Sequence, residues 1–219
     1  FLNGYPIDDK VSKLPPDELL QLGVLPSIEG LYAWDEPSFD GIIISHAHID
    51  HYGLLKYVHS DIPVYLSAGT KTLIDVSQTF KIVQPYPVNA RIFKMYASFS
   101  VGDITVKPYL MDHSAFDSAA FEILAEGKTI LYSGDFRGHG RKAVCLDIFI
   151  KRAQKQADVL FTEGTMVSRG TDEVTIKENE LELAAIDEIK KQTGIVLFQS
   201  SGQNIDRIVS FYRAALQCG

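Results

Sequence analysis

The spacing of hydrophobic and polar residues changes along the chain, and each change predicts a different kind of structure. In the first third, short apolar runs alternate with amphipathic segments. Residues 39–45 and 63–67 are predicted as buried strands, and residues 52–58 and 69–80 as helices. This strand–helix–strand–helix order favours parallel pairing of the two strands.

Turn-forming residues dominate residues 1–38, where we expect one short helix, over residues 16–21, with proline at its start. Residues 81–101 show no clear period. Further on, the apolar period becomes two, which is typical of strands. The strands predicted in this part are 104–109, 119–125 and 129–133. Glu126-Gly127-Lys128 predicts a tight hairpin between the last two strands.

The last third returns to alternating helices and strands. The predicted order is helix 142–156, buried strand 158–162, helix 174–192, strand 194–199 and helix 204–216. Antiparallel hairpins therefore lie between two groups of α/β units. This order predicts an α+β fold with a layered sheet covered by helices, and not a simple doubly wound sheet.

Composition narrows the classes of protein. The chain has 46% hydrophobic and 22% charged residues, as soluble globular proteins do. Its net charge of −7 gives no bulk attraction to nucleic acid, so a nucleic-acid site would need a local basic patch or a metal centre. Two cysteines cannot form a disulfide framework, which favours a reducing, cytoplasmic location. No apolar run approaches the roughly 20 residues that span a bilayer, so we expect no membrane partner.

Candidate chemistry is concentrated in the stretch Ser45-His46-Ala47-His48-Ile49-Asp50-His51, directly after an apolar strand. Side chains two residues apart in an extended turn point the same way, so His46 and His48 are predicted to face one metal ion. Asp50 and His51 diverge from that pair and are predicted to face a second ion. Imidazole and carboxylate ligands suit zinc, iron or manganese. The alternative is three surface histidines and a helix cap.

Two later strand ends are predicted to complete this site. His113, in Asp112-His113-Ser114, follows one strand, and Asp135, in Ser133-Gly134-Asp135, follows another. A carboxylate at that place can bridge two cations, and the glycine lets the backbone come close. His59 is expected to be solvated, and His139, between two glycines, has no decided role.

With these residues placed, the chain resembles the metallo-β-lactamase-fold hydrolases. His46, His48, Asp50 and His51 match the H-x-H-x-D-H motif of that superfamily, His113 matches its next histidine and Asp135 its bridging aspartate. The resemblance implies a layered αββα fold. It also implies two divalent metal ions, with zinc favoured over manganese or iron.

The flanking segments resemble the β-CASP branch, which includes RNase J-type ribonucleases. Besides residues 112–114 and 132–137, they are Leu160-Phe161-Thr162-Glu163-Gly164-Thr165 and residues 199–207. This resemblance implies a metallo-β-lactamase-like domain over residues 1–160 and the beginning of a β-CASP domain over residues 161–219. It implies an RNA substrate, with Glu163 helping to protonate the leaving group together with a β-CASP histidine that this chain lacks. Our hypothesis for Asp50 is that it also orients the nucleophile.

The chain departs from the superfamily pattern at both ends. Residues 1–38 lack the two opening strands, the chain does not begin with Met, and no histidine follows His139 to supply the branch's last ligand. We therefore expect a chain truncated at both ends. A missing ligand could also come from a partner chain, which keeps a homodimer open.

Three alternatives to an RNA phosphodiesterase exist, and the sequence disfavours two of them. A small-molecule metallohydrolase on the same fold, such as a lactonase or thioesterase, leaves Glu163-Gly164-Thr165 and residues 200–207 without an obvious task. A metal-free binding protein is disfavoured because His46, His48, Asp50 and His51 are all present. A lactamase with a thiolate ligand is disfavoured because no cysteine stands at a ligand position.

Overall fold

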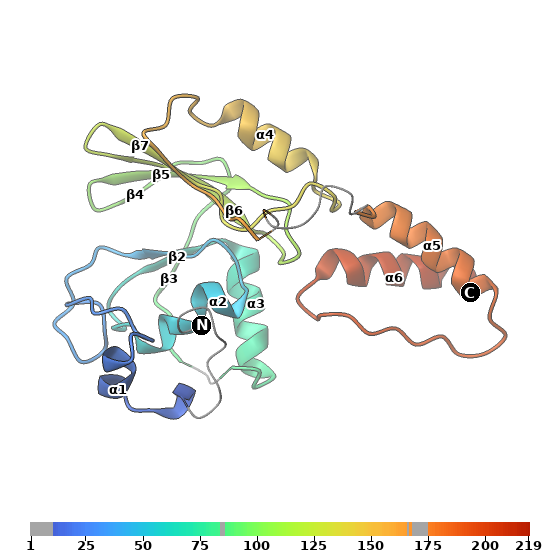
Figure 1. The fold of residues 1–219 in the computed structure, drawn as a ribbon, viewed down its shortest axis with the longest axis horizontal. Helices are drawn as coiled ribbons and strands as arrows, with labels where there is room; N and C mark the ends of the chain where they lie inside the picture. Colours follow the sequence, from blue (N-terminus) through green and yellow to red (C-terminus); the bar gives the residue numbers. More distant parts are fainter. Residues whose placement is uncertain (1–10, 84–85, 166, 168–174) are drawn as a thin grey trace.

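The structure, a computed structural model, describes residues 11–83, 86–165, 167 and 175–219, and it contains two β-sheets (Figure 1). The first is parallel and consists of β1 (Ile42–Ile43), β2 (Val64–Leu66) and β3 (Ala90–Ile92), in that order. The second consists of β4 (Phe99–Val101), β5 (Ile104–Leu110), β6 (Ala119–Ala125), β7 (Lys128–Tyr132) and β8 (Val159–Phe161). Its strands are antiparallel except for the parallel pair β7–β8. The predicted parallel pairing of the first two strands is confirmed.

Helices lie around both sheets. Before the first sheet are the short 3-10 helix η1 (Val11–Lys13) and α1 (Pro16–Gln21). Next come α2 (Ile49–Tyr52), the 3-10 helix η2 (Gly53–Tyr57) and α3 (Ala68–Thr79), and later α4 (Val144–Arg152), α5 (Glu178–Lys190) and α6 (Ile205–Cys218). None of the helices in the described ranges is both long and apolar enough to cross a membrane.

Three buried clusters show how the layers are stacked. Ile44, Leu66 and Ile74 belong to a cluster between the first sheet and the helices α2 and α3. The cluster of Phe93, Val101, Val106, Ala119 and Phe121 lies between the sheets, because Ile43 and Tyr65 of the first sheet pack against it. The cluster of Tyr109, Met111, Ala120, Phe149 and Ala153 joins the second sheet to α4. The order helix, sheet, sheet, helix is the predicted αββα layering.

The hairpin between β6 and β7 forms at the predicted residues. Glu126 has φ +51° and Gly127 has φ +72°, and Ala125 pairs with Lys128. Two successive positive φ angles twist the turn in the sense that matches the twist of antiparallel strands. This turn fixes the register of β7 against β6. Tyr132 is the last residue of β7, so the register also sets where the residues after Tyr132 lie.

The α5–α6 helix pair lies beside the two-sheet body, and its helices run in the same direction (Figure 1). Ser210 in the second turn of α6 contacts Glu178 at the start of α5, and Cys218 at the end of α6 contacts Ile186 farther along α5. Residues 191–204 connect the end of α5 back to the start of α6. Phe198 of this return stacks on Phe211 of α6, with ring centroids 4.4 Å apart.

Several predicted elements differ from the structure. The helix expected over 52–58 is divided between α2 and η2, and the loose segment 81–101 contains β3 and β4. The strand expected over 194–199 does not form, because a strand needs a hydrogen-bonded neighbour and none lies beside it in the described part of the chain. Residue 174, the predicted start of a helix, lies outside the described residues.

The predicted strand 158–162 exists as β8, but it is not buried. Its three side chains are 41–60% exposed. β8 is the last strand of its sheet, and a strand at a sheet edge has a neighbour on one side only. The apolar run there was wrongly assigned to the interior.

Candidate metal centre

The histidine turn begins at the end of β1 and is held between the two sheets. Ile44 donates its backbone N–H to the carbonyl of Tyr65 at 2.9 Å, and Ala119 donates to the carbonyl of Ser45 at 2.9 Å. These bonds fix both sides of the turn at Ser45. His48 has extended backbone angles, φ −83° and ψ 141°, and the first residue of α2 follows it. The turn therefore starts extended and ends helical, with Asp50 in the first turn of α2.

His46, His48, His113 and Asp135 converge on one point. One ligand atom from each of these four residues lies within 4.8 Å of the others. Nε2 of His113 is 3.0 Å from Nδ1 of His48, and the ring centroids of His46 and His113 are 4.6 Å apart. The sequence spreads these residues over 90 positions, and the strand ends of both sheets bring them together.

Asp50 and His51 join the same group through Asp135. Oδ2 of Asp135 is 3.3 Å from Nε2 of His51 and 3.7 Å from Nε2 of His46. Nε2 of His51 is also 3.6 Å from Oδ2 of Asp50. The Asp135 carboxylate thus lies between the group with His46 and the pair Asp50–His51, and all six residues predicted for the site are neighbours.

The electrostatics of the group suit a cation. Burial, reinforced by neighbouring imidazoles, lowers the pKa of His46 to about 2, and burial followed by the charges of His48 and Arg137 lowers that of His113 to about 3. Burial lowers the pKa of His48 as well, although Asp50 and Asp135 oppose it. Neutral imidazoles keep a nitrogen lone pair free for a metal ion.

One atom in the group lacks a hydrogen-bond partner. Nε2 of the fully buried His46 has none among the described residues, although Nδ1 of the same ring is 3.0 Å from Oγ of Ser45. A buried polar atom left unpaired destabilises a protein by about 1–3 kcal/mol, so native structures rarely leave one. A metal ion at this nitrogen would satisfy it, and the donor set of imidazoles and carboxylates fits zinc, manganese or iron.

Gly134 is required for the approach of Asp135. Its φ is +58°, which side-chain-bearing residues rarely adopt, and a Cβ there would lie 2.9 Å from the carbonyl oxygen of Ala119. Burial raises the pKa of Asp135; the charge of His51 opposes this rise, while Glu163 and Asp50 add to it. A cation beside Asp135 would offset that burial and repulsion.

Glu163 lies close to the group but is not part of it. Its Oε1 accepts a 2.6 Å hydrogen bond from the backbone N–H of Phe136, and its own N–H donates to Oγ of Ser133 at 3.3 Å. These bonds tie the end of β8 to both sides of Asp135. His59 lies elsewhere, where its ring accepts a hydrogen bond from the Asp61 backbone, and the carbonyl of His139 accepts one from Glu178.

Some supporting contacts were not predicted from the sequence. Oγ of Ser114 lies 3.4 Å from Nε2 of His48. The Gln203 side chain, which precedes α6, donates to the carbonyl of Ala47 at 3.0 Å. Gln203 is 156 positions from Ala47 in the sequence, and no local pattern links two such residues.

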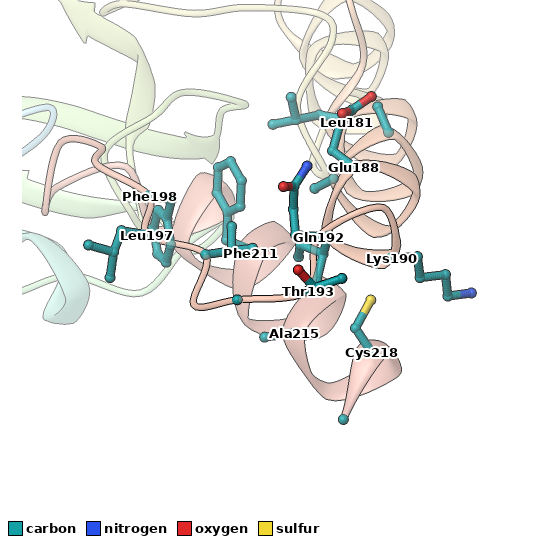
Figure 2. A pocket seen from close by; sticks show the side chains of 16 residues that line it. Leu181, Glu188, Lys190, Gln192, Thr193, Leu197, Phe198, Phe211, Ala215 and Cys218 are labelled. Atoms are coloured by element: carbon teal, nitrogen blue, oxygen red, sulfur yellow. The ribbon is translucent and has the colours of Figure 1, made fainter.

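Two cavities differ in their relation to this centre. One, of about 520 Å³, is lined by apolar residues including Ile42, Ile44 and Leu55 and reaches Asp50 and His51. The other, of about 860 Å³, lies between α5, α6 and the returning segment (Figure 2). As described, its lining contains no histidine, so it is not a second metal centre of this kind.

Comparisons with known proteins identify the family of this chain. The family described as "Beta-lactamase superfamily domain" matches residues 19–196. Ribonuclease J of Sinorhizobium meliloti is 32% identical over 117 residues, which are 52% of this chain and 20% of that protein. An RNase J-like protein of Methanocaldococcus jannaschii is 27% identical over 159 residues, 67% of this chain and 36% of that protein. The chain thus spans well under half the length of these relatives.

A solved structure gives the same fold over the whole chain. A protein of unknown function from Enterococcus faecalis V583 superimposes with a TM-score of 0.76 at 20% identity, and the match covers 100% of this chain and 59% of that one. At this identity the likeness concerns the fold alone. Together with the family match over residues 19–196, it means that the chain belongs to the β-lactamase superfamily domain family, with a metallo-β-lactamase fold and a sequence that is RNase J-like.

Proposed function

We propose that this chain carries the dinuclear metal centre of a hydrolase that cleaves phosphodiester bonds in RNA. The observation that supports it most is the convergence of ligand atoms of His46, His48, His113 and Asp135 within 4.8 Å of one another. His51 lies beside Asp135, and Asp50 lies beside His51. The partial similarity to two RNase J-type proteins supports RNA as the substrate class.

The proposed ligands fall into two groups that share Asp135. His46, His48 and His113 would hold one ion, and Asp50 and His51 the other. Zinc is favoured for this donor set, with manganese and iron as alternatives. When bound, two such cations lower the pKa of a coordinated water and stabilise negative charge on a reacting phosphate group.

Two residues of the chain would act on the reacting groups, one on the nucleophile and one on the leaving group. The side chain of Asp50 is 58% exposed, so one of its oxygens is accessible to orient the nucleophile. Glu163 is proposed to help protonate the leaving group. Its bond to the Phe136 amide holds it beside Asp135, and therefore on the same side of the site.

Two further parts of the proposal concern organisation. Residues 1–160 are proposed as the metallo-β-lactamase-like domain and residues 161–219 as the beginning of a β-CASP domain. The position of the α5–α6 helix pair beside the two-sheet body supports this division (Figure 1). A cytoplasmic location and a homodimer remain proposals from the sequence.

A second candidate function follows from the apolar cavity that reaches Asp50 and His51. A cavity of that lining suits the acyl part of a lactone or thioester more than a polar nucleotide chain. A small-molecule metallohydrolase is therefore the alternative.

The two functions separate in a direct assay. The zinc and manganese content of the chain is measured first, in the parent, in His48→Ala and in His59→Ala, a histidine outside the site. We expect the loss of bound metal in His48→Ala alone.

A 5′-phosphorylated RNA and a lactone are then offered to the parent. RNA cleavage that His48→Ala abolishes supports the proposal. Equal metal binding by His48→Ala contradicts the assigned site, and lactone hydrolysis with intact RNA contradicts the nuclease function.

A further inference from the structure

A cluster of charged side chains joins the loop after Asp135 to the α5–α6 helix pair, and the proposed function gives it no role. We call it the ionic bridge. Its members are Asp112, Arg137, Arg141, Lys142, Glu178, Glu182, Asp206 and Arg207. Four are basic and four acidic, so the charges balance. The acidic members are largely buried, with Asp112 and Glu178 only 0–2% exposed.

Arg137 occupies the middle of the ionic bridge. On one side its Nε lies 3.4 Å from Oδ1 of Asp112. On the other, its Nη2 pairs with Asp206 of α6, and its Nη1 is 3.9 Å from Oε1 of Glu178 of α5. Its guanidinium group therefore contacts the two-sheet body and both helices of the pair.

The Asp112 end of this connection reaches the metal centre. Asp112 immediately precedes His113, and Arg137 is two residues after Asp135. The backbone N–H of Arg137 donates to the Asp112 carbonyl at 2.7 Å, and Gly140 donates to Oδ2 of Asp112 at 2.7 Å. The loops that carry His113 and Asp135 are thus bonded to each other at the residue where α6 is attached.

The start of α6 also contacts the histidine turn directly. Gln203, three residues before Asp206, donates its side-chain N–H to the carbonyl of Ala47, between His46 and His48. The start of α6 therefore holds all the loops that carry the proposed ligands of the first metal ion. Gln203 holds the histidine turn directly, and Asp206 holds the loops of His113 and Asp135 through Arg137.

Substitution of Arg137 or of a carboxylate that pairs with it should disturb this connection. Removing one member of a buried ion pair leaves an uncompensated charge, so the remaining groups must move or take up water. Arginine bridges two carboxylates with a planar fork, which lysine cannot reproduce. Residues that orient metal ligands from behind commonly change metal affinity about 10–100-fold when they are replaced.

We propose that Arg137 is a positioning residue through which docking of the α5–α6 helix pair sets the geometry of the metal centre. By linkage, metal binding then strengthens the docking of the pair as much as the docked pair strengthens metal binding. This inference rests on the metal-binding part of the proposed function.

The test uses the intact chain and compares three variants. Arg137→Lys keeps the charge and loses the fork, and Asp206→Asn removes the charge that Arg137 contacts on α6. Glu182→Gln is the matched control, because Glu182 pairs with Arg141 in the same ionic bridge but has no bond to Asp112. Zinc affinity is measured by competition with a chelator, and the visible spectrum of the cobalt-loaded protein reports ligand geometry. Amide exchange of α6 is measured with and without zinc.

We expect Arg137→Lys and Asp206→Asn to bind zinc about tenfold more weakly and to alter the cobalt spectrum, while Glu182→Gln matches the parent. Zinc should slow amide exchange in α6 of the parent, a result that needs no variant to fold. Zinc affinity and cobalt spectra of Arg137→Lys equal to those of the parent overturn the inference, as does unchanged exchange in α6. Equal weakening by Glu182→Gln overturns it too, since it would show general loosening. A parent that binds no zinc contradicts the proposed function as well, which separates the two failures.

Discussion

Lowering the pH should destabilise the metal-free chain through its buried histidines. The folded chain keeps His46 and His113 neutral, because burial lowers their pKa values to about 2 and about 3. In the unfolded chain the same side chains have the ordinary value of 6.5. Below that value the unfolded chain binds protons that the folded chain does not, so the free energy of unfolding falls as the pH falls.

The expected size follows from the two pKa values. Between pH 7 and pH 5.5, a histidine that titrates only when unfolded removes about 1 kcal/mol from the free energy of unfolding. His46 and His113 together remove about 2–3 kcal/mol, a large part of the roughly 5–15 kcal/mol that stabilises a typical domain. Stability lost in this range should return as the pH rises above 6.5, where both states are neutral.

Urea unfolding in the presence of a chelator, followed by circular dichroism at both pH values, measures this loss. The variant His46→Gln removes one of the two groups, and its loss of stability between those pH values should be smaller than that of the parent by about 1 kcal/mol. Carboxylates elsewhere titrate equally in both proteins and cancel in the comparison. The same pH dependence in parent and variant would refute the conclusion that the fold holds His46 neutral.

Three other substitutions test local backbone strain and packing at different places in the chain. Gly134→Ala should weaken zinc binding and lower stability by about 1–3 kcal/mol, because its φ of +58° is strained for alanine, and calorimetry with and without zinc checks both effects. Phe121→Ala should destabilise the chain by about 3–5 kcal/mol in urea unfolding, since Phe121 is 2% exposed and packs edge-to-face on Phe93. Leu197→Asp should change unfolding by no more than about 0.5 kcal/mol, because Leu197 is 88% exposed; a larger loss would place that segment in the interior.

Much of the fold could be predicted from local patterns. Proline at the helix start located α1 at Pro16–Gln21, and a short apolar run before the Glu126-Gly127-Lys128 turn located β6 at Ala119–Ala125. The errors occurred where pairing or burial depends on distant segments. β3 and β4 have three residues each, too few to show a period, and β8 is apolar although it lies at a sheet edge.

The proposed ligand residues of the candidate site could be predicted from the sequence. The residues that hold these ligands in place were harder to predict. His46, His48, Asp50 and His51 are close in the sequence, so their spacing alone predicts a metal turn. His113 and Asp135 could be added because each follows the end of a predicted strand. In the structure those strands, β5 and β7, run in the same direction on either side of β6, so they end at the same edge of the sheet. Gln203 could not be connected to Ala47, since sequence distance gives no information on a contact between a late helix and an early turn.

The sequence by itself determined where most strands end and which side chains follow them, because alternation, apolar runs and turn formers act over a few residues. That is enough to predict a layered α+β chain and the six neighbours of the proposed metal centre. Only the tertiary structure decided that Oδ2 of Asp135 lies between His46 and His51, and that Arg137 joins Asp112 to Asp206. Those contacts depend on how whole layers pack, and packing is a property of surfaces assembled from distant segments.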